Sequence, residues 1–275
     1  QTLDTFKPDI VLTWMSRASE LCPQGPYVRA ARLGGYYNLK YYQKADHLIG
    51  NTQGIRDYCT QQGWPLNFSH YLPNFVDAPS CSIVQDRQAL STPKDAPVLL
   101  ALGRLHRNKG FDILIPALAQ IPGVYLWLGG EGEERKALEI LAAKYHGMDR
   151  VRFLGWRKDV SALYQAADIY VCPSRIEPLG NVVIEAWAHQ KPVVSADSAG
   201  PKSLINHLEN GLLTPIDDIN QLASAIQEVL QNKVLFKKVT QAGYQSYLDN
   251  FTEEKIIAQY IAFFEHVQGK KRLKV

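Results

Sequence analysis

Two glutamates that follow a predicted strand are the first candidates for chemistry. Glu177 and Glu185 are the two ends of the segment EPLGNVVIE, which comes directly after the apolar run DIYVCPS. Open α/β sheets bind ligands at the carboxyl ends of their parallel strands, so Glu177 is predicted to lie at such an edge. Gly180 permits a close backbone approach, and a helix is predicted to begin near Asn181, where free N–H groups would attract an anion.

These side chains suit a sugar ligand. Carboxylates accept hydrogen bonds from neighbouring hydroxyl groups. Glu185 lies about one turn into the predicted helix and can therefore face the same side as Glu177. The alternative is that Glu177 only caps the helix and Glu185 is solvated, because acidic residues are common near helix starts. Taken alone, the segment leaves both interpretations open.

A basic segment follows another predicted strand. GRLHRNKG, residues 103–110, comes after the run VLLAL and precedes a predicted helix. Arg104 and Lys109 could meet at the end of that strand, where a guanidinium and an ammonium group together can hold a diphosphate. The alternative is a solvated basic loop. The Gly-rich segment 129–134 lacks the full GxGxxG spacing and carries acidic residues, so it is rejected as a dinucleotide-binding fingerprint.

The elements that must position these residues alternate between strand and helix. Strands are predicted at 97–103, 124–130, 151–155, 168–174 and 192–197, and helices at 109–121, 131–146, 159–167, after Gly180 and at 219–231. Apolar runs that alternate with helical segments predict a parallel sheet covered on both faces.

The first part of the chain has a weaker pattern of the same kind. Strands are predicted at 10–12, 48–53 and 70–77, a helix at 54–63, and helical spacing of apolar residues at 36–48. A proline-containing stretch without sustained periodicity, residues 76–97, then suggests a linker. The predicted domains are an N-terminal Rossmann-like domain at 1–80, a linker at 81–96, a C-terminal Rossmann-like domain at 97–250, and a C-terminal helix with a basic tail at 251–275.

Composition narrows the class of protein. The chain has 275 residues, of which 46% are apolar and 21% charged, and its formal net charge is +3. These values are typical of a folded protein and do not indicate a nucleic-acid partner. No apolar run approaches the roughly 20 residues that span a bilayer. The four cysteines are widely spaced and the histidines show no metal-ligand spacing, so neither a disulfide framework nor a metal site is predicted.

The resemblance to a known family rests on several segments that occur in order. GRLHRNKG, LWLGGEGEE, VRFLGWRKDV, the run from AADIYVCPS to SADSAGP, and NGLLTP resemble the retaining glycosyltransferases of family 4, with E-x7-E at 177–185 as the signature. KADHLIGNTQGIRDYCTQQG and LPNFVD resemble the last part of that family's N-terminal domain, and KPDIVLTWMSRA resembles lipopolysaccharide-type bacterial members. The strand and Gly-rich loop with which the family begins have no counterpart, so the resemblance implies an incomplete N-terminal domain.

The resemblance implies an α/β protein of the GT-B type, with two Rossmann-like parallel-sheet domains and a cleft between them. It also implies that residues 1–80 are a partial, acceptor-side domain, that residues 97–250 bind the nucleotide sugar, and that the C-terminal helix in 251–275 returns to the N-terminal domain. It implies transfer of a sugar from a nucleotide-diphosphate donor to a glycan or glycolipid hydroxyl, with retained anomeric configuration, in bacterial lipopolysaccharide or other glycan synthesis. The catalytic residues that it implies are Arg104 and Lys109 at the diphosphate and Glu177 at the donor sugar. The donor-binding residues that it implies are the backbone of Leu179, Gly180, Asn181 and Val182, then Glu185 at the ribose, and Trp156 and Arg157 near the base.

The chain departs from the family pattern at two positions, and two alternative functions remain open. Ser203 stands where the family usually has a glutamate and Trp14 where it often has a histidine, so no general base is assigned. No metal or other cofactor is expected. One alternative function is a non-catalytic remnant that binds a nucleotide sugar. Another is a glycosidase with Glu177 and Glu185 as its carboxylate pair, against which Arg104 and Lys109 count.

The expected location is cytoplasmic. The basic tail GKKRLKV and the lipopolysaccharide-like start also suggest loose contact with the inner face of the membrane.

Overall fold

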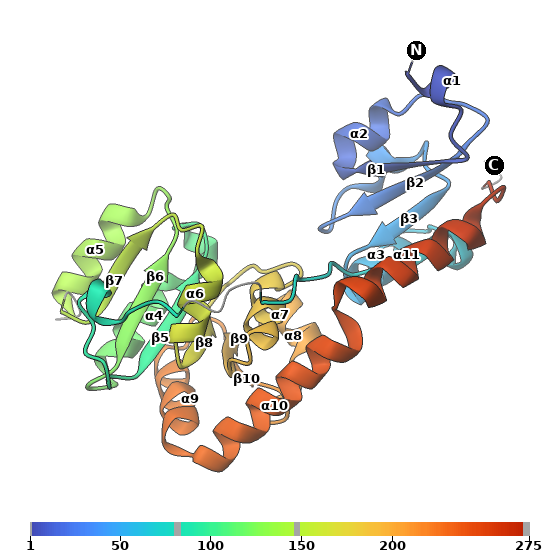
Figure 1. The fold of residues 1–275 in the computed structure, drawn as a ribbon. Coiled ribbons are helices and arrows are strands. Elements are labelled where there is room, and N and C mark those ends of the chain that lie inside the picture. The colour runs from blue at the N-terminus through green and yellow to red at the C-terminus, as the bar shows by residue number, and fades with distance from the viewer. Residues whose placement is uncertain (1, 80–83, 146–148, 272–275) are drawn as a thin grey trace. The chain divides into compact units, whose positions relative to one another are not determined.

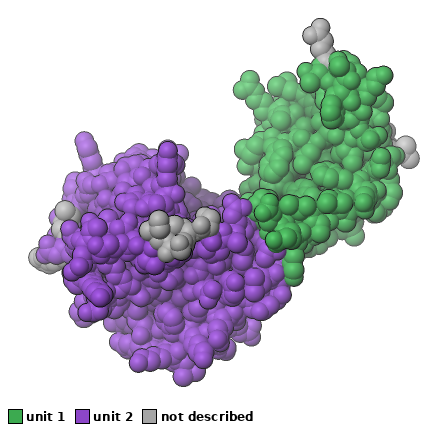
Figure 2. Space-filling model, viewed as in Figure 1, with its two compact units in different colours: residues 1–75, 253–275 green, residues 76–252 purple. Residues whose placement is uncertain are grey.

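The computed structural model describes residues 2–79, 84–145 and 149–271 (Figure 1). The chain divides into two compact units, one made of residues 1–75 and 253–275 and the other of residues 76–252 (Figure 2). Each unit is an α/β body with its own parallel sheet.

The first unit is built on a four-stranded parallel sheet. Its strands, in spatial order, are β1 (Ile10–Trp14), β2 (Val28–Leu33), β3 (His47–Gly50) and β4 (Ser69–Tyr71). Its helices are α1 (Thr2–Phe6), α2 (Met15–Leu21), α3 (Gln53–Gln61) and α11 (Glu253–Val267), with 3-10 turns η1 (Leu39–Tyr42) and η2 (Leu66–Phe68).

Side chains on the two sides of this sheet join different cores. Phe263 and Val267 of α11 are buried in one cluster with Val28 and Ala30 of β2. The alternate residues of β2, Ala31 and Leu33, join a second cluster with the residues Tyr42 of η1 and Ile55 of α3. This alternation follows from the two-residue period of a strand. The C-terminal helix therefore belongs to the same core as the first strands of the chain.

One expectation for this unit is wrong, and one of its strands was not predicted. Residues 36–48 form no long helix, because only the short turn η1 is helical. Residues three apart share a face in such a turn, so Leu39 and Tyr42 are both buried without a longer helix. Strand β2 was not predicted, because Arg29 and Arg32 interrupt its apolar pattern. Arg29 is buried beside Asp46, with 3.8 Å between Nε and Oδ2.

The second unit contains a six-stranded parallel sheet. Its strands are β5 (Val98–Leu102), β6 (Tyr125–Gly129), β7 (Val151–Gly155), β8 (Ile169–Cys172), β9 (Val193–Ala196) and β10 (Leu212–Thr214). Its helices are α4 (Phe111–Ala119), α5 (Arg135–Lys144), α6 (Val160–Ala166), α7 (Asn181–Ala188), α8 (Ala199–Leu204), α9 (Ile219–Gln231) and α10 (Lys233–Asn250), with 3-10 turns η3 (Gln88–Leu90) and η4 (Arg107–Lys109).

The strand order of this sheet, β10-β9-β8-β5-β6-β7, creates a switch point. From β5 the chain runs to β6 and β7 on one side and then returns to place β8 on the other side of β5. The loops that follow β5 and β8 therefore begin at the carboxyl ends of two adjacent strands. Open α/β sheets bind ligands at such a switch point.

Helices cover both faces of this sheet (Figure 1). One core contains side chains of α4, α5 and α9, and the other contains side chains of α6 and α7. Helix α10 contributes to both cores, through Val239 and Tyr247 respectively. The predicted parallel sheet with helices on both faces is thus confirmed. The expected strands and helices at 97–231 were found, and β10 is an additional short strand.

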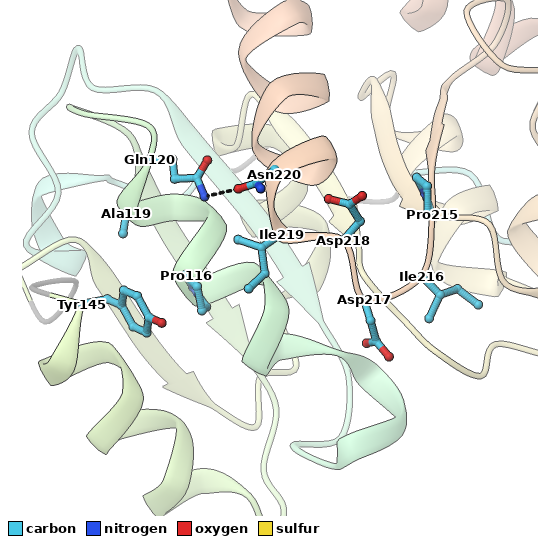
Figure 3. Close-up of a pocket in the computed structure, with 10 residues that line it drawn as sticks. All are labelled: Pro116, Ala119, Gln120, Tyr145, Pro215, Ile216, Asp217, Asp218, Ile219 and Asn220. Atoms are coloured by element: carbon cyan, nitrogen blue, oxygen red, sulfur yellow. Dashed lines mark hydrogen bonds between the residues drawn. The ribbon is translucent and has the colours of Figure 1, made fainter.

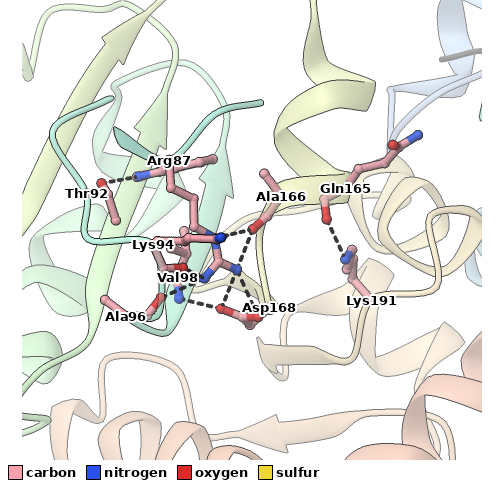
Figure 4. A network of polar contacts seen from close by, with 10 residues as sticks. Arg87, Thr92, Lys94, Ala96, Val98, Gln165, Ala166, Asp168 and Lys191 are labelled. Carbon is pink, nitrogen blue, oxygen red and sulfur yellow. Dashed lines mark hydrogen bonds and ion pairs between the residues drawn. The ribbon is translucent and has the colours of Figure 1, made fainter. Parts of the chain in front are cut away.

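One arginine in the described part of the predicted linker 81–96 makes several contacts with the second unit (Figure 4). Arg87 donates to the carbonyl oxygens of Lys94, Ala96 and Ala166 at 3.1, 2.8 and 2.7 Å. It also contacts both carboxylate oxygens of Asp168, which accepts a further bond from the Val98 N–H. Asp168 and Val98 lie at the amino ends of β8 and β5, so this network is at the opposite edge from the switch-point loops. Residues 81–83 of the predicted linker lie outside the described residues.

Three further findings concern the described residues only. None of their helices is long and apolar enough to cross a membrane. Cys22, Cys59 and Cys172 are free thiols, while Cys81 is outside the described ranges. In those same ranges no group of three or more His, Cys, Asp or Glu side chains has a metal-binding arrangement. Residues 272–275 of the basic tail also lie outside them.

Candidate functional site

Two loops meet at the switch point of the second unit. One follows β5 and contains η4, and the other follows β8 and leads to α7. The carbonyl oxygen of Asn108 accepts hydrogen bonds from the N–H groups of Arg175 and Ile176, at 2.8 and 3.2 Å. A Cβ atom at Gly110, where φ is +66°, would lie only 2.0 Å from the carbonyl oxygen of Pro173. Glycine is therefore required for this approach, which holds the two loops in direct contact.

The contact between the loops brings Lys109 and Glu177 together. The distance from Lys109 Nζ to Glu177 Oε2 is 2.5 Å, and the two side chains are 23% and 12% exposed. These residues were predicted to bind different parts of one ligand, a diphosphate and a sugar. The structure places them side by side, so an ammonium donor and a carboxylate acceptor are available within one small region.

The turn after Glu177 leads directly into helix α7. Gly180 adopts φ +82° and is the N-cap, so no cap side chain stands in front of the first N–H groups of the helix. The Gly200 N–H donates to the carbonyl oxygen of Glu177 at 2.7 Å. A Cβ at Gly200 would lie 2.5 Å from that oxygen and 2.5 Å from the carbonyl carbon of Leu179. Helix α8 thus contacts and supports this turn, and the predicted residues 179–182 lead from the turn into the first residues of α7.

Glu185 lies further along α7 and is partly buried. Burial raises the pKa of its carboxyl group, and the neighbouring Glu177 acts in the same direction, while Tyr164 and Lys109 lower it. The Tyr164 hydroxyl is 3.4 Å from Glu185 Oε2 and 3.2 Å from the carbonyl oxygen of Val182. Glu185 thus lies on the helix that follows Glu177, and its pKa responds to both Glu177 and Lys109.

Tyr164 was not predicted and is held in place by its neighbours. Its ring stacks on His189 with a centroid distance of 4.6 Å, and it also contacts Tyr170. His189 in turn contacts the Ser161 hydroxyl and the carbonyl oxygen of Glu185. The segment DVSALYQAA gives no sign of this role, because Tyr164 lies at a buried helical position that looks like ordinary core.

Arg104, Trp156 and Arg157 lie around a second hollow beside the first loop. The hollow has a volume of about 350 Å³ and is lined by Leu102, Gly103, Arg104, Gly129, Gly130, Glu131, Trp156, Arg157 and Val160. Glycines at the ends of β5 and β6 form part of it. A Cβ at Gly130 would lie 1.8 Å from the Gly103 carbonyl oxygen, so these two strand ends need glycine to approach so closely.

The side chains at this hollow have separate partners. Arg104 is 69% exposed and pairs with Glu133, with 3.0 Å between Nη2 and Oε2. Arg157 donates to Asp159, which raises the pKa of the arginine, and to Gln85 at 3.0 Å. Trp156 is 69% exposed. Arg104 and Lys109 lie in the same loop, and each pairs with its own carboxylate, Glu133 and Glu177 respectively.

Gly103 links the two regions of the site. The position of a Cβ at Gly103 would be 3.3 Å from both Cδ and Cε of Lys109, so the lysine stem runs alongside this glycine. Arg104 is the next residue of the chain. The predicted site residues therefore form two adjoining regions, one with Lys109, Glu177 and Glu185 and one with Arg104, Trp156 and Arg157.

A larger hollow in the same unit contains none of the predicted residues (Figure 3). Its volume is about 680 Å³, and it is lined by Pro116, Ala119, Gln120, Tyr145, Pro215, Ile216, Asp217, Asp218, Ile219 and Asn220. The charged side chains that line it are both carboxylates. It is therefore poorly suited to a diphosphate, and size alone does not identify the site.

With the fold and the geometry of the candidate site described, comparison with known proteins gives the family of this chain. Residues 82–247 match the family model described as "Glycosyl transferases group 1". The chain therefore belongs to the glycosyl transferases group 1 family.

Curated relatives point to the same family. The chain is 40% identical, over 258 residues, to the lipopolysaccharide core biosynthesis glycosyltransferase LpsE of Rhizobium meliloti, which covers 93% of this chain and 75% of the relative. It is 33% identical over 273 residues to LpsD of the same organism, covering 98% of this chain and 79% of the relative.

Solved structures share the fold. Sucrose-phosphate synthase of Thermosynechococcus elongatus has a TM-score of 0.84 and 25% identity over 97% of this chain and 75% of its own. Anabaena HepE in complex with UDP has a TM-score of 0.87 and 24% identity over 96% of this chain and 81% of its own. At this identity HepE shows the fold alone. The predicted GT-B type, with two Rossmann-like parallel-sheet domains, is confirmed, and so is the prediction of a glycosyltransferase.

Proposed function

We propose that the protein is a retaining glycosyltransferase of family 4 that takes its sugar from a nucleotide diphosphate. The observation that carries this proposal is the Lys109–Glu177 pair, which lies at the switch point of the second sheet and beside the start of α7. The segment from Glu177 to Glu185 serves as the E-x7-E motif of that family. LpsE and LpsD are named for lipopolysaccharide core biosynthesis, which supports a bacterial glycan or glycolipid as the acceptor.

The reaction requires stabilisation of a departing diphosphate. As the bond between sugar and phosphate breaks, negative charge grows on the phosphate oxygens and the sugar becomes oxocarbenium-like. Lys109, Arg104 and the N-terminus of α7 supply positive charge where it is needed, as groups fixed before the reaction begins. In this proposal they do so without a metal ion. Glu177 accepts hydrogen bonds from hydroxyl groups of the donor sugar.

The nucleoside occupies the rest of the site. Glu185 accepts hydrogen bonds from the two ribose hydroxyls, and the base lies in the hollow beside Trp156 and Arg157. HepE was solved with UDP, with UDP and glucose, and with UDP-glucose, which supports a nucleotide sugar as the donor here. UDP is therefore the first nucleotide to test.

Substitutions of the two cations test the proposal. Arg104→Ala and Lys109→Ala should each lower the rate of transfer on the order of 10²–10³-fold, because each removes a preorganised positive group. Lys237→Ala, at an exposed position of α10, is the matched control and should transfer at the normal rate. Calorimetry with UDP, and NMR of the product's anomeric configuration, complete the test.

The outcomes separate the proposal from its alternative. Transfer with retained configuration that depends on Lys109 and Arg104 supports it. Normal transfer by both alanine variants would contradict the site. Binding of UDP without transfer to any glycan or glycolipid acceptor would instead favour a non-catalytic nucleotide-sugar-binding remnant, and inversion at the anomeric carbon would remove the family 4 assignment.

A further inference from the structure

One arginine in the loop after β8 contacts the turn that contains Lys109. Arg175 lies in the loop after β8, two residues before Glu177, and its side chain is 18% exposed. Its Nη1 and Nη2 donate to both carboxylate oxygens of Asp112, at 2.8 and 2.7 Å. The same Nη1 donates to the carbonyl oxygen of Arg107 at 2.6 Å, and Nε lies 2.6 Å from Asp217 Oδ1.

These contacts tie three parts of the second unit to one guanidinium group. Asp112 is in the first turn of α4, Asp217 precedes α9, and Arg107 begins the turn η4 that contains Lys109. The backbone of Arg175 adds a fourth tie, because its N–H donates to the carbonyl oxygen of Asn108 at 2.8 Å. The side chain of Arg175 thus holds Arg107, and its backbone N–H holds Asn108.

The contacts hold the backbone next to Lys109 and the loop that leads to Glu177. Lys109 comes directly after Asn108, and Glu177 comes two residues after Arg175. The carboxylates of Asp112 and Asp217 raise the pKa of Arg175, so it stays charged in this position. Lysine could not replace it, because one ammonium group lacks the planar fork that meets both oxygens of a carboxylate.

We propose that Arg175 is a positioning residue for donor binding, which sets Lys109 against Glu177 without touching the donor itself. The inference rests on the proposed function, since it assumes that Lys109 binds the diphosphate. It predicts that Arg175 affects nucleotide affinity only through Lys109. Two residues that act as one unit have non-additive effects, whereas independent residues have effects that multiply.

A double-mutant cycle on the full chain tests this, with UDP affinity measured by calorimetry. Arg175→Met and Lys109→Met should each weaken UDP binding on the order of tenfold, and the double variant should bind no more weakly than Lys109→Met alone. Arg175→Lys should resemble Arg175→Met.

A matched control separates positioning from general stability. Arg150 donates to the carbonyl oxygens of Leu118, Ile121 and Val124, so it is also a multiply bonded arginine of the second unit. Arg150→Met should lower the unfolding midpoint but leave UDP affinity within about twofold of wild type. If Arg175→Met fails to fold, Asp112→Asn removes one of the charges that hold Arg175. Asp112→Asn alone should also weaken UDP binding. Combined with Lys109→Met, it should cause no further loss of UDP affinity.

The results distinguish failure of this inference from failure of the proposed function. Normal affinity in Arg175→Met, or multiplied losses in the double variant, would overturn the role of Arg175 while leaving Lys109 in place. Normal affinity in Lys109→Met would instead overturn the assignment of Lys109 to the diphosphate, and the inference with it.

Discussion

Replacing Gly110 by alanine should separate the two loops that form the candidate site. The backbone at Gly110 is left-handed, which costs an alanine roughly 1–2 kcal/mol. The new Cβ would lie 2.0 Å from the Pro173 carbonyl oxygen, whereas ordinary contact begins at 3.4 Å, so the loops must move apart by about 1.4 Å. Overpacking of this kind adds about 1–3 kcal/mol. We therefore expect a loss of about 2–5 kcal/mol in the free energy of unfolding.

The chain offers a matched control for this substitution. Gly123 has φ +78° and nothing within 4 Å of its Cβ position, so Gly123→Ala introduces the same backbone strain without a clash. It should cost only about 1–2 kcal/mol and leave UDP binding unchanged.

Urea unfolding and calorimetry with UDP measure both effects. Displacement of Lys109 from Glu177 by about 1 Å should also reduce transfer on the order of 10²-fold in Gly110→Ala. Equal destabilisation by the two alanines, or normal UDP affinity in Gly110→Ala, would refute the reasoning that the loop contact builds the site.

Two further predictions concern the base hollow and the first unit. Trp156→Ala should weaken UDP binding about tenfold and Trp156→Phe much less, because base stacking on an aromatic side chain contributes about 1–3 kcal/mol; equal binding by both variants in calorimetry would place the base elsewhere. In the first unit, burial lowers the pKa of His47 and lowers that of His70 to about 4, and the two rings are 2.9 Å apart between Nδ1 and Nε2. The neutral forms therefore stabilise the folded state, so stability should be complete above about pH 6.5 and fall progressively between pH 6.5 and 4. Hydrogen exchange of β3 measured across this range should show the decline in wild type and a flatter profile in His70→Gln; an identical slope in both would contradict the role of His70.

Much of the second unit could be predicted because buried parallel strands are continuous apolar runs. VLLAL of β5 and IYVC of β8 are of this kind, and the glycine before α7 marks the helix start correctly. Strand β2 was not predicted because it contains two arginines, which are buried beside partners from other parts of the sequence. Arg29 pairs with Asp46, and Arg32 donates to the Tyr260 hydroxyl. A local pattern cannot contain those partners.

The candidate site, too, could be predicted only in part from the sequence. The residue types and the strand-end positions of Lys109 and Glu177 could be recognised, but their direct contact joins residues 68 positions apart in the sequence. It depends on β8 lying beside β5, which is a property of the sheet order. For the same reason Arg175 and Tyr164 could not be identified as supporting residues, and the pairing of Arg104 with Glu133 could not be foreseen.

A crystal structure of the chain with UDP tests the central claim most directly. The account predicts the diphosphate beside Lys109 and the start of α7, the ribose at Glu185 and the base at Trp156. UDP bound instead in the hollow lined by Tyr145 and Asp217, or at any place remote from Lys109, would contradict it.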